Sequence, residues 1–534
     1  MEKTQENFEI KLKNRLVLGL LSSFLILCSA WLILHLLCGT LPSLSFSSMA
    51  TLFLLVTFLV MQFAILFLKH KVCLHSYKSR FEAVWSFLDP TRWLIVGVQM
   101  VCGACLAGIL LKVLNIDGTA SCDNNETTCL NVTQIGGIMF GAVCGATVAL
   151  KETTLISFPV IHLPLIVILK RDKFSIIQQS FAKTLSVFLI FFPLFGWQGL
   201  LICDALASRF EVGLDRESFL SLLSPAFFFP VFLAGFFVYL AQKVSFLMFE
   251  HFQTQHIRVP VGSPNLDTEP KERLFYGLSQ KSCSLVQLLA FHDLKYLAEN
   301  DVSRRKDLFS LSTPGGNPYN WNAILGVCLD IINEFTRRVD PNAHRQSASS
   351  PEKQLAKDSV NRGEITPYLL KSRSLTSVYE TSPIKITDSA TKEEKGFLET
   401  LKENTYKRMM EIRFVAYIFG INDVAYLQNA FHESMPVKLG VHSLSHLCSA
   451  AKEEDEYGVV QKDMVHIMKS FLELQAALER QTRIPIHERK PLLTTVRSAI
   501  YRITYTYGKQ LTSLNLEEVY RNQLGSYLNL RMMS

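Results

Sequence analysis

Two histidines, His442 and His446, stand one helical turn apart, and imidazole nitrogens at that spacing can bind a transition metal. A zinc protease motif would also need a glutamate directly after the first histidine, where this chain has Ser443. No other cluster of ligand residues is evident nearby in the sequence. We therefore predict that the pair lies on an ordinary helix face, and we expect neither a metal nor another cofactor.

A polar segment at 112–134 carries residues that are modified in oxidising compartments. Cys122 and Cys129 could form a disulfide, and Asn125 and Asn131 each begin an Asn-x-Thr sequon. Disulfides and N-glycans both belong to the lumenal side of a membrane. The pattern predicts a lumenal loop, and the alternative is a polar loop with sequons by chance.

A glycine-rich turn precedes one of the expected helices. Pro314, Gly315, Gly316 and Pro318 predict a rigid turn, and Asn320 suits the N-cap of a helix through residues 321–335. Glycines before a helix can cradle a phosphate, but the Lys-Ser/Thr pair of a P-loop does not follow them. The turn therefore has a structural rather than a nucleotide-binding interpretation.

Residues 338–395 are polar and lack periodic apolar positions, so we predict a disordered linker. It contains Ser350, Thr366 and Ser382, each followed by proline, which would suit proline-directed kinases. Such short motifs are frequent in disordered segments. They are candidate phosphorylation sites of low specificity.

Six long apolar runs lie in the first half of the chain, and the helices that they form must position the residues described above. Each approaches or reaches the roughly 20 residues that cross a bilayer, and none contains Asp, Glu, Lys or Arg. Backbone groups cannot remain unpaired in lipid, so each run should be helical. The predicted spans are 17–37, 49–68, 93–111, 135–150, 185–203 and 227–240.

Positive residues are distributed unevenly between these runs. The N-terminal tail and the loops after the second and fourth runs hold fourteen Lys and Arg, whereas the three alternate loops hold three. The positive-inside rule therefore predicts that both termini are cytoplasmic. Residues 155–169 are apolar but contain two prolines, and we predict an interfacial or re-entrant segment there rather than a seventh span.

Small residues at four-residue spacing predict close helix packing within the membrane. Gly137, Gly141 and Gly145 line one face of the fourth run, and Ala104 and Gly108 have the same spacing in the third. Such faces let neighbouring backbones approach each other. The alternative is that glycine is simply common in membrane helices.

The chain therefore has an all-α organisation in which a transmembrane bundle precedes a soluble helical domain. We expect a cytoplasmic tail at 1–15, the bundle at 16–249 and a Pro/Gly-rich linker at 250–270. Helical segments at 271–337 and 397–534 flank the disordered linker and show apolar residues at helical spacing. The run 500–507 would also suit a strand, but Gly508 is placed to end a helix.

Transport and catalysis are the rival functions of a polytopic protein. A transporter or channel usually places ionisable residues inside the membrane, and the six predicted runs have none. No acid–base or nucleophile constellation is evident in the sequence, so an enzyme is not expected. A membrane anchor that binds other proteins through its soluble half is the favoured prediction, with a transporter or channel as the alternative.

The soluble half also resembles a known family. The run FSLSTPGGNPYNWNAI at 309–324, which includes Phe309 and Trp321, closely resembles the characteristic segment of the NDC-type (nuclear division cycle) transmembrane nucleoporins. Segments 440–450, 457–461 and 498–504 resemble other stretches of that family. The six-span layout agrees too, so the resemblance covers essentially the whole chain.

The resemblance implies a multi-pass protein of the nuclear envelope that anchors the pore complex and supports its assembly. Its implied partners are Aladin-type nucleoporins, membrane-binding inner-ring nucleoporins and other pore membrane proteins, with no direct binding of nucleic acid or of a small-molecule substrate. The family has no catalytic residues to transfer. The Ser/Pro-rich linker is much shorter here than in vertebrate members, so functions that reside in that linker are not transferred to this chain.

Overall fold

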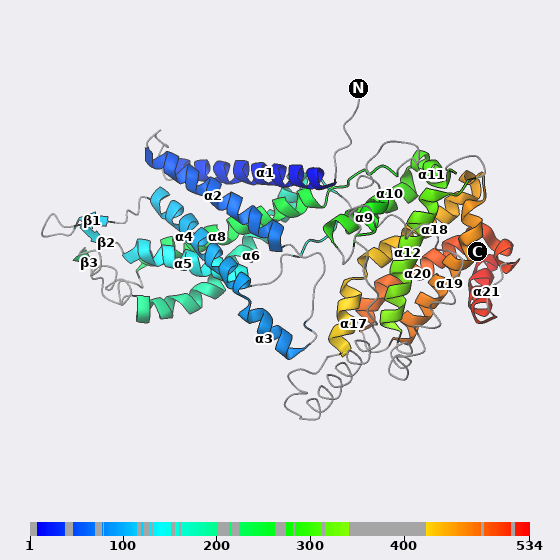
Figure 1. Ribbon diagram of the computed structural model, residues 1–534. Coiled ribbons are helices and arrows are strands. Elements are labelled where there is room, and N and C mark those ends of the chain that lie inside the picture. Colours follow the sequence, from blue (N-terminus) through cyan, green and yellow to red (C-terminus); the bar gives the residue numbers. More distant parts are fainter. Residues whose placement is uncertain are drawn as a thin grey trace, which may run out of the picture. The chain divides into compact units, whose positions relative to one another are not determined.

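Six long helices, each sufficiently long and apolar to cross a membrane, dominate the N-terminal half (Figure 1). They are α1 (Phe8–Leu37), α2 (Phe46–Lys69), α4 (Pro90–Val113), α5 (Val132–Leu150), α6 (Leu165–Leu194) and α8 (Pro225–Gln253). A helix pairs the backbone N–H and C=O groups of its interior with one another, and the interior of a bilayer requires such pairing. The prediction of an all-α fold with six spanning helices is confirmed.

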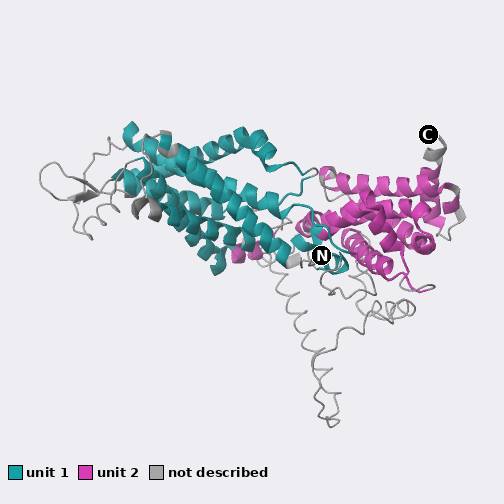
Figure 2. Cartoon of the chain, turned by 90° about the horizontal axis from the view of Figure 1, so that it is seen from above, with its two compact units in different colours: residues 1–74, 87–260, 268–289 teal, residues 75–86, 261–267, 290–534 magenta. Residues whose placement is uncertain are grey.

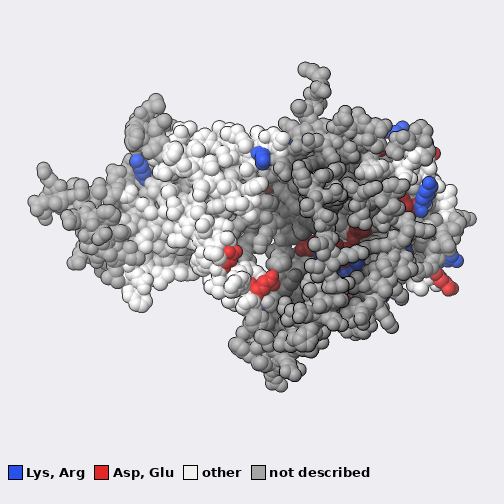
Figure 3. All heavy atoms as spheres, in the orientation of Figure 1, with Lys and Arg blue, Asp and Glu red and all other residues white. Residues whose placement is uncertain are grey.

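The computed structural model describes residues 8–37, 46–69, 77, 79–114, 119–121, 128–130, 132–150, 155–159, 162–199, 213–214, 224–261, 274–280, 284–311, 316–340, 423–481, 485–513 and 518–533. The chain divides into two compact units (Figure 2). Unit 1 comprises residues 1–74, 87–260 and 268–289, and unit 2 comprises residues 75–86, 261–267 and 290–534. The six apolar helices belong to unit 1, and few Lys, Arg, Asp or Glu residues are visible among its described atoms in Figure 3.

The remaining described elements between the membrane helices are short. They are α3 (Arg80–Leu88), the π-helical turn η1 (Phe195–Gly199) and three strands: β1 (Thr119–Ser121), β2 (Thr128–Leu130) and β3 (Gly213–Leu214). β2 pairs antiparallel with β1, with Cys129 opposite Ala120, and parallel with β3.

Helix α6 begins at Leu165, twenty residues before the predicted fifth span at 185–203. Residues 155–159 and 162–164 are not helical, so only the end of the predicted interfacial segment joins the helix. The added turns carry charged side chains, among them Lys173 and Lys183, which a search for uncharged runs leaves out. The helix continues through them because Ile176, Ser180 and Thr184 keep a buried face at four-residue spacing.

The closest helix packing in unit 1 joins α4 and α5. A Cβ atom added to Gly145 would collide with the backbone oxygen of Gln99, and one added to Gly141 would meet the Gly103 oxygen at 2.6 Å. A Cβ on Gly137 would lie 2.6 Å from a methyl carbon of Leu111. All three glycines of α5 therefore face α4. At Gly141 and Gly145 the neighbouring backbone leaves room only for hydrogen, whereas the flexible Leu111 side chain could move away from a methyl group at Gly137.

On α4, the residues against these glycines are Gly103 and Ala107, one position earlier than the predicted pair Ala104 and Gly108. Gly103 and Ala107 are buried, and Ala104 is half-buried. A Cβ on Gly108 would make an ordinary contact with Ile138 at 3.9 Å. Both pairs have the same spacing, so only the rotation of α4 about its axis distinguishes them.

The C-terminal half is also helical (Figure 1). They are α9 (Leu274–Leu278), α10 (Leu285–Asn300), α11 (Val302–Phe309), α12 (Tyr319–Val339), α17 (Asp423–His432), α18 (Met435–Glu454), α19 (Val459–Arg480), α20 (Ile486–Tyr507), the 3₁₀ helix η4 (Gly508–Ser513) and α21 (Glu518–Met533). In unit 2, α18 packs on α20, and α12 packs on α18 and α19. The ambiguous run 500–507 is helical, and Gly508 ends α20 with a φ of +54°.

Candidate functional site

The segment that resembles the pore-membrane nucleoporins forms the junction of α11, α12 and α19. Trp321 is fully buried, its ring centroid lies 5.9 Å from that of Phe309, and its indole nitrogen donates a hydrogen bond of 2.9 Å to Asp463. Burying an indole normally requires such a partner for its N–H. The unusual residues of this segment therefore build the core of unit 2.

The turn before α12 differs from the prediction in one respect. The N-cap residue of α12 is Pro318, so Asn320 lies in the first turn of the helix rather than before it. Its side-chain amide donates instead to the carbonyl oxygen of Asp307, at 3.4 Å. Gly316 and Pro318 lie in the connection ahead of α12, whereas Pro314 and Gly315 are outside the described residues.

Two arginines next to each other in α11 hold three helices together. Arg304 makes a two-pronged ion pair with Asp293 of α10, with N–O distances of 3.0 and 2.6 Å, and both side chains are buried. Arg305 pairs in the same way with Glu454 of α18, at 2.8 and 2.7 Å, and also donates to the carbonyl oxygens of Leu297 and Ala298. These charges had no place in the sequence-based prediction, because their partners are distant in the chain.

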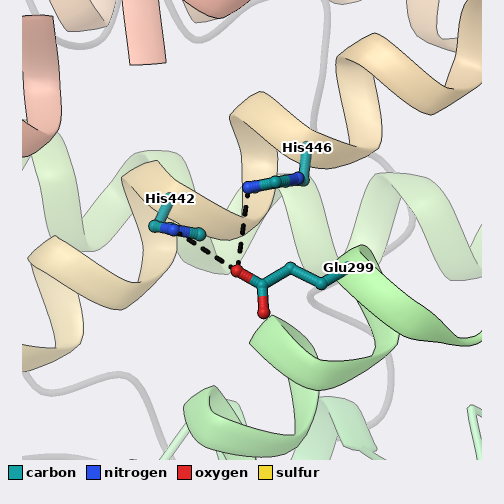
Figure 4. Close-up of side chains that lie close together, drawn as sticks. All are labelled: Glu299, His442 and His446. Carbon is teal, nitrogen blue, oxygen red and sulfur yellow. Dashed lines mark ion pairs between the residues drawn. The ribbon is translucent and has the colours of Figure 1, made fainter. Parts of the chain in front are cut away.

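His442 and His446 meet a third potential ligand, Glu299 of α10 (Figure 4). The Nε2 atoms of the two histidines lie 3.4 and 3.7 Å from the same carboxylate oxygen of Glu299, and the two imidazole rings stack with centroids 4.6 Å apart. Two imidazoles and a carboxylate are ligands that zinc accepts. Sequence reasoning missed Glu299 because nothing near the histidines indicates it.

The surroundings of this cluster are basic, which disfavours adding a cation. Burial, with Lys295, Arg502 and Lys438, lowers the pKa of His442 to about 4. Burial, with Arg502, His442 and Lys295, lowers the pKa of His446 to about 4 as well. Arg305 also lowers the pKa of His446, although Arg305 is itself paired with Glu454. The cluster is therefore best described as two neutral histidines packed against Glu299 between α10 and α18.

Neutral histidines make the stability of unit 2 depend on pH. Their folded-state pKa lies below the ordinary value of 6.5, so the unfolded chain binds protons more readily. This contribution to stability is complete above about pH 6.5 and is lost as the pH falls toward 4. We expect the free energy of unfolding to drop by about 1–3 kcal/mol between pH 7.5 and pH 5.5. Chemical denaturation of the full chain at both pH values measures it.

The control is the double variant His442→Gln/His446→Gln, which removes both titrating groups. It should lose most of this pH dependence, since ordinary carboxylates titrate at lower pH. An equal pH dependence in the variant and the unchanged chain would contradict the assignment.

Several predicted modification sites fall outside the described residues: Cys122, Asn125, Asn131, Ser350, Thr366 and Ser382. Only the backbone of Cys129 is described, in the centre of β2. The predicted disordered linker at 338–395 also lies outside the described residues beyond Asp340.

This geometry is that of a multi-pass membrane protein with a separate helical unit in its C-terminal half. The family described as nucleoporin protein Ndc1-Nup matches residues 12–524. The chain belongs to this nucleoporin family. Members of the family are structural components of the nuclear pore membrane and interact with other pore components. The resemblance inferred from the sequence is confirmed.

Related proteins from different animals match between half and 85% of the chain at low identity. Nucleoporin NDC1 of Xenopus laevis is 22% identical over 511 residues, covering 76% of this chain and 77% of the relative. Nucleoporin NDC1 of Mus musculus is 22% identical over 575 residues, covering 85% of each chain. Nucleoporin ndc-1 of Caenorhabditis elegans is 24% identical over 295 residues, covering 52% of this chain and 47% of the relative.

Proposed function

We propose that this protein anchors the scaffold of the nuclear pore complex in the nuclear envelope and supports pore assembly. The observation that carries the proposal is that one chain, matched by one family model over residues 12–524, contains both a set of apolar helices and a second helical unit. The six apolar helices form one compact unit, and further helices form the other. The first part stays in the bilayer, and the second binds soluble nucleoporins.

The same proposal places both termini on the cytoplasmic or pore side of the membrane. It is supported by the excess of Lys and Arg in the N-terminal tail and alternate loops. The sequons at Asn125 and Asn131, with Cys122 and Cys129, then belong to the lumen. Protease added outside sealed microsomes should leave the 112–134 loop intact, and cleavage there would reverse the orientation.

The docking surface that we propose lies on α20. Tyr501 and Tyr505 stand one turn apart on its outer face, 37% and 58% exposed, with ring centroids 6.1 Å apart. Tyrosine is enriched in protein interfaces because it offers a large, stiff surface with a polar end. We propose that an Aladin-type or a membrane-binding inner-ring nucleoporin packs on these rings.

The test measures binding of each purified candidate partner to the detergent-solubilised full chain. Tyr501→Ala/Tyr505→Ala should weaken binding at least about tenfold, since interface aromatics commonly contribute more than 1 kcal/mol each. Tyr296→Ala, which truncates an exposed tyrosine on α10, is the matched control and should change little. Unchanged binding by the double variant would exclude this surface, and no binding by the unchanged chain would exclude direct docking of these partners.

A further inference from the structure

A cavity of about 380 Å³ opens between α2, α5, α6 and α8 of unit 1. Two basic side chains, Lys183 of α6 and Lys243 of α8, lie on its wall, and none of the described residues on that wall is acidic. A wall that carries two positive charges attracts anions and repels cations. The position of the two lysines in a shared cavity therefore suggests an anionic ligand.

The cavity lies near one surface of the bilayer. At a rise of 1.5 Å per residue, Gln62, Thr147 and Lys243 lie about 22–27 Å along their helices from Phe46, Val132 and Pro225. These helices are the second, fourth and sixth of the six spans, and successive spans cross the membrane in opposite directions. Their starts therefore share one side of the membrane. The hydrocarbon core is about 30 Å thick, so the cavity is at the depth where the opposite leaflet meets its headgroups. The proposed orientation makes this the cytoplasmic leaflet.

The inner wall of the cavity is polar. Gln242 and Gln62 are buried there, and both bond to Gln99: Gln242 donates to Gln99 at 3.0 Å, and Gln99 donates to Gln62 at 2.7 Å. The side-chain oxygen of Gln242 is buried without a hydrogen-bond partner among the described residues. A buried, unpaired amide oxygen costs free energy, and a hydroxyl or ammonium donor on a ligand would relieve it.

The outer wall is apolar. Leu66, Val187, Ile190 and Phe246 contribute to it, and Ile190 is 65% exposed. In a bilayer, an apolar side chain exposed on a spanning helix meets lipid chains. The Lys243 ammonium lies 6.0 Å from the centre of the Phe246 ring, at the boundary between the apolar and basic parts. The cavity thus offers cations, amide groups and an adjoining apolar surface in one place.

We propose that this cavity binds an anionic phospholipid, with the phosphate between Lys183 and Lys243, a headgroup donor at Gln242 and an acyl chain along Val187 and Ile190. The cytoplasmic leaflet is rich in anionic lipids, and basic pockets between membrane helices recognise their headgroups. The assignment to that leaflet rests on the orientation under the proposed function. Lipid binding itself is independent of docking on α20.

The experiment uses the full chain in detergent and native mass spectrometry with added phosphatidylinositol or phosphatidylcholine. We expect one retained phosphatidylinositol per chain and little phosphatidylcholine. Lys183→Gln/Lys243→Gln should weaken retention about 30-fold, because each basic group near a membrane surface contributes about fivefold. Lys170→Gln, which neutralises an exposed lysine of the same helix outside the cavity, should leave it unchanged.

Equal retention by the double variant and the unchanged chain would overturn the proposal, as would equal retention of both lipids. A separate arm with glycerophosphoinositol, which lacks acyl chains, distinguishes a lipid site from a site for a free phosphate ester. Binding of that soluble compound as tightly as the lipid would overturn the assignment to a lipid.

A photoactivatable phosphatidylinositol on the unchanged chain tests the same point without any variant that could misfold. Labelled peptides should include residues 179–190 or 239–246, which line the cavity. Labelling confined to other helices would overturn the proposal.

Discussion

Replacing Asp293 by alanine is expected to lower the free energy of unfolding of unit 2 by about 3–5 kcal/mol. Asp293 is fully buried and forms both prongs of the ion pair with Arg304, whose side chain is only 7% exposed. Its removal leaves a buried guanidinium without its counter-charge, and that cost exceeds the value of an ordinary hydrogen bond. Hydrogen exchange of the amides in α10 and α11 of the full chain measures the change locally.

Two controls separate the buried charge from general effects of truncation. Asp340→Ala removes an aspartate that pairs with the 48%-exposed Arg480 and is itself only partly buried, and it should cost no more than about 1 kcal/mol. Asp293→Leu/Arg304→Met removes both charges together and should be much less damaging than Asp293→Ala alone. A cost for Asp293→Ala no larger than that for Asp340→Ala would refute the role of the buried pair.

Replacing Gly145 by alanine in α5 should destabilise the membrane bundle by about 1–3 kcal/mol, although alanine is intrinsically the better helix former. The new methyl group would collide with the backbone oxygen of Gln99 in α4, and backbone cannot move aside as a flexible side chain can. The two helices must separate, which gives up the close contact between them. Thermal unfolding of the full chain in one fixed detergent follows the effect.

Gly97→Ala is the matched control, since it makes the same chemical change in α4. A Cβ at that position meets no atom of the described residues within 4 Å. It should therefore stabilise the helix by about 0.5–1 kcal/mol through the lower backbone entropy of the unfolded chain. The two alanines are expected to shift the melting temperature in opposite directions. Equal shifts would mean that α4 and α5 are not in close contact.

The membrane helices could be predicted from the sequence because lipid leaves the backbone almost no choice. Apolar length alone requires a helix, which is why the all-α fold and the number of spans agree with the structure. The start of α6 at Leu165 was not predicted. Charged residues such as Lys173 and Lys183 end an apolar run in the sequence, but they do not end a helix that a neighbouring helix stabilises.

The residues that share one face of a helix could also be predicted from their spacing, whereas the residues of other helices that they contact could not. The sequence alone puts Gly137, Gly141 and Gly145 on one face of α5, and His442 and His446 on one face of α18. The residues that those faces meet, Gln99 and Gly103 in one case and Glu299 in the other, follow only from the tertiary structure. The same holds for Asp293 with Arg304 and for Lys183 and Lys243, which share the wall of the cavity in unit 1.

The sequence by itself determined the class of protein, the helical fold and the family, because hydropathy, periodicity and a long unusual segment are properties of neighbouring residues. The tertiary structure decided which charges are buried, which glycines contact the backbone of a neighbouring helix and where a cavity opens. Those properties depend on contacts between residues far apart in the chain, and the rotation of each helix about its axis sets those contacts.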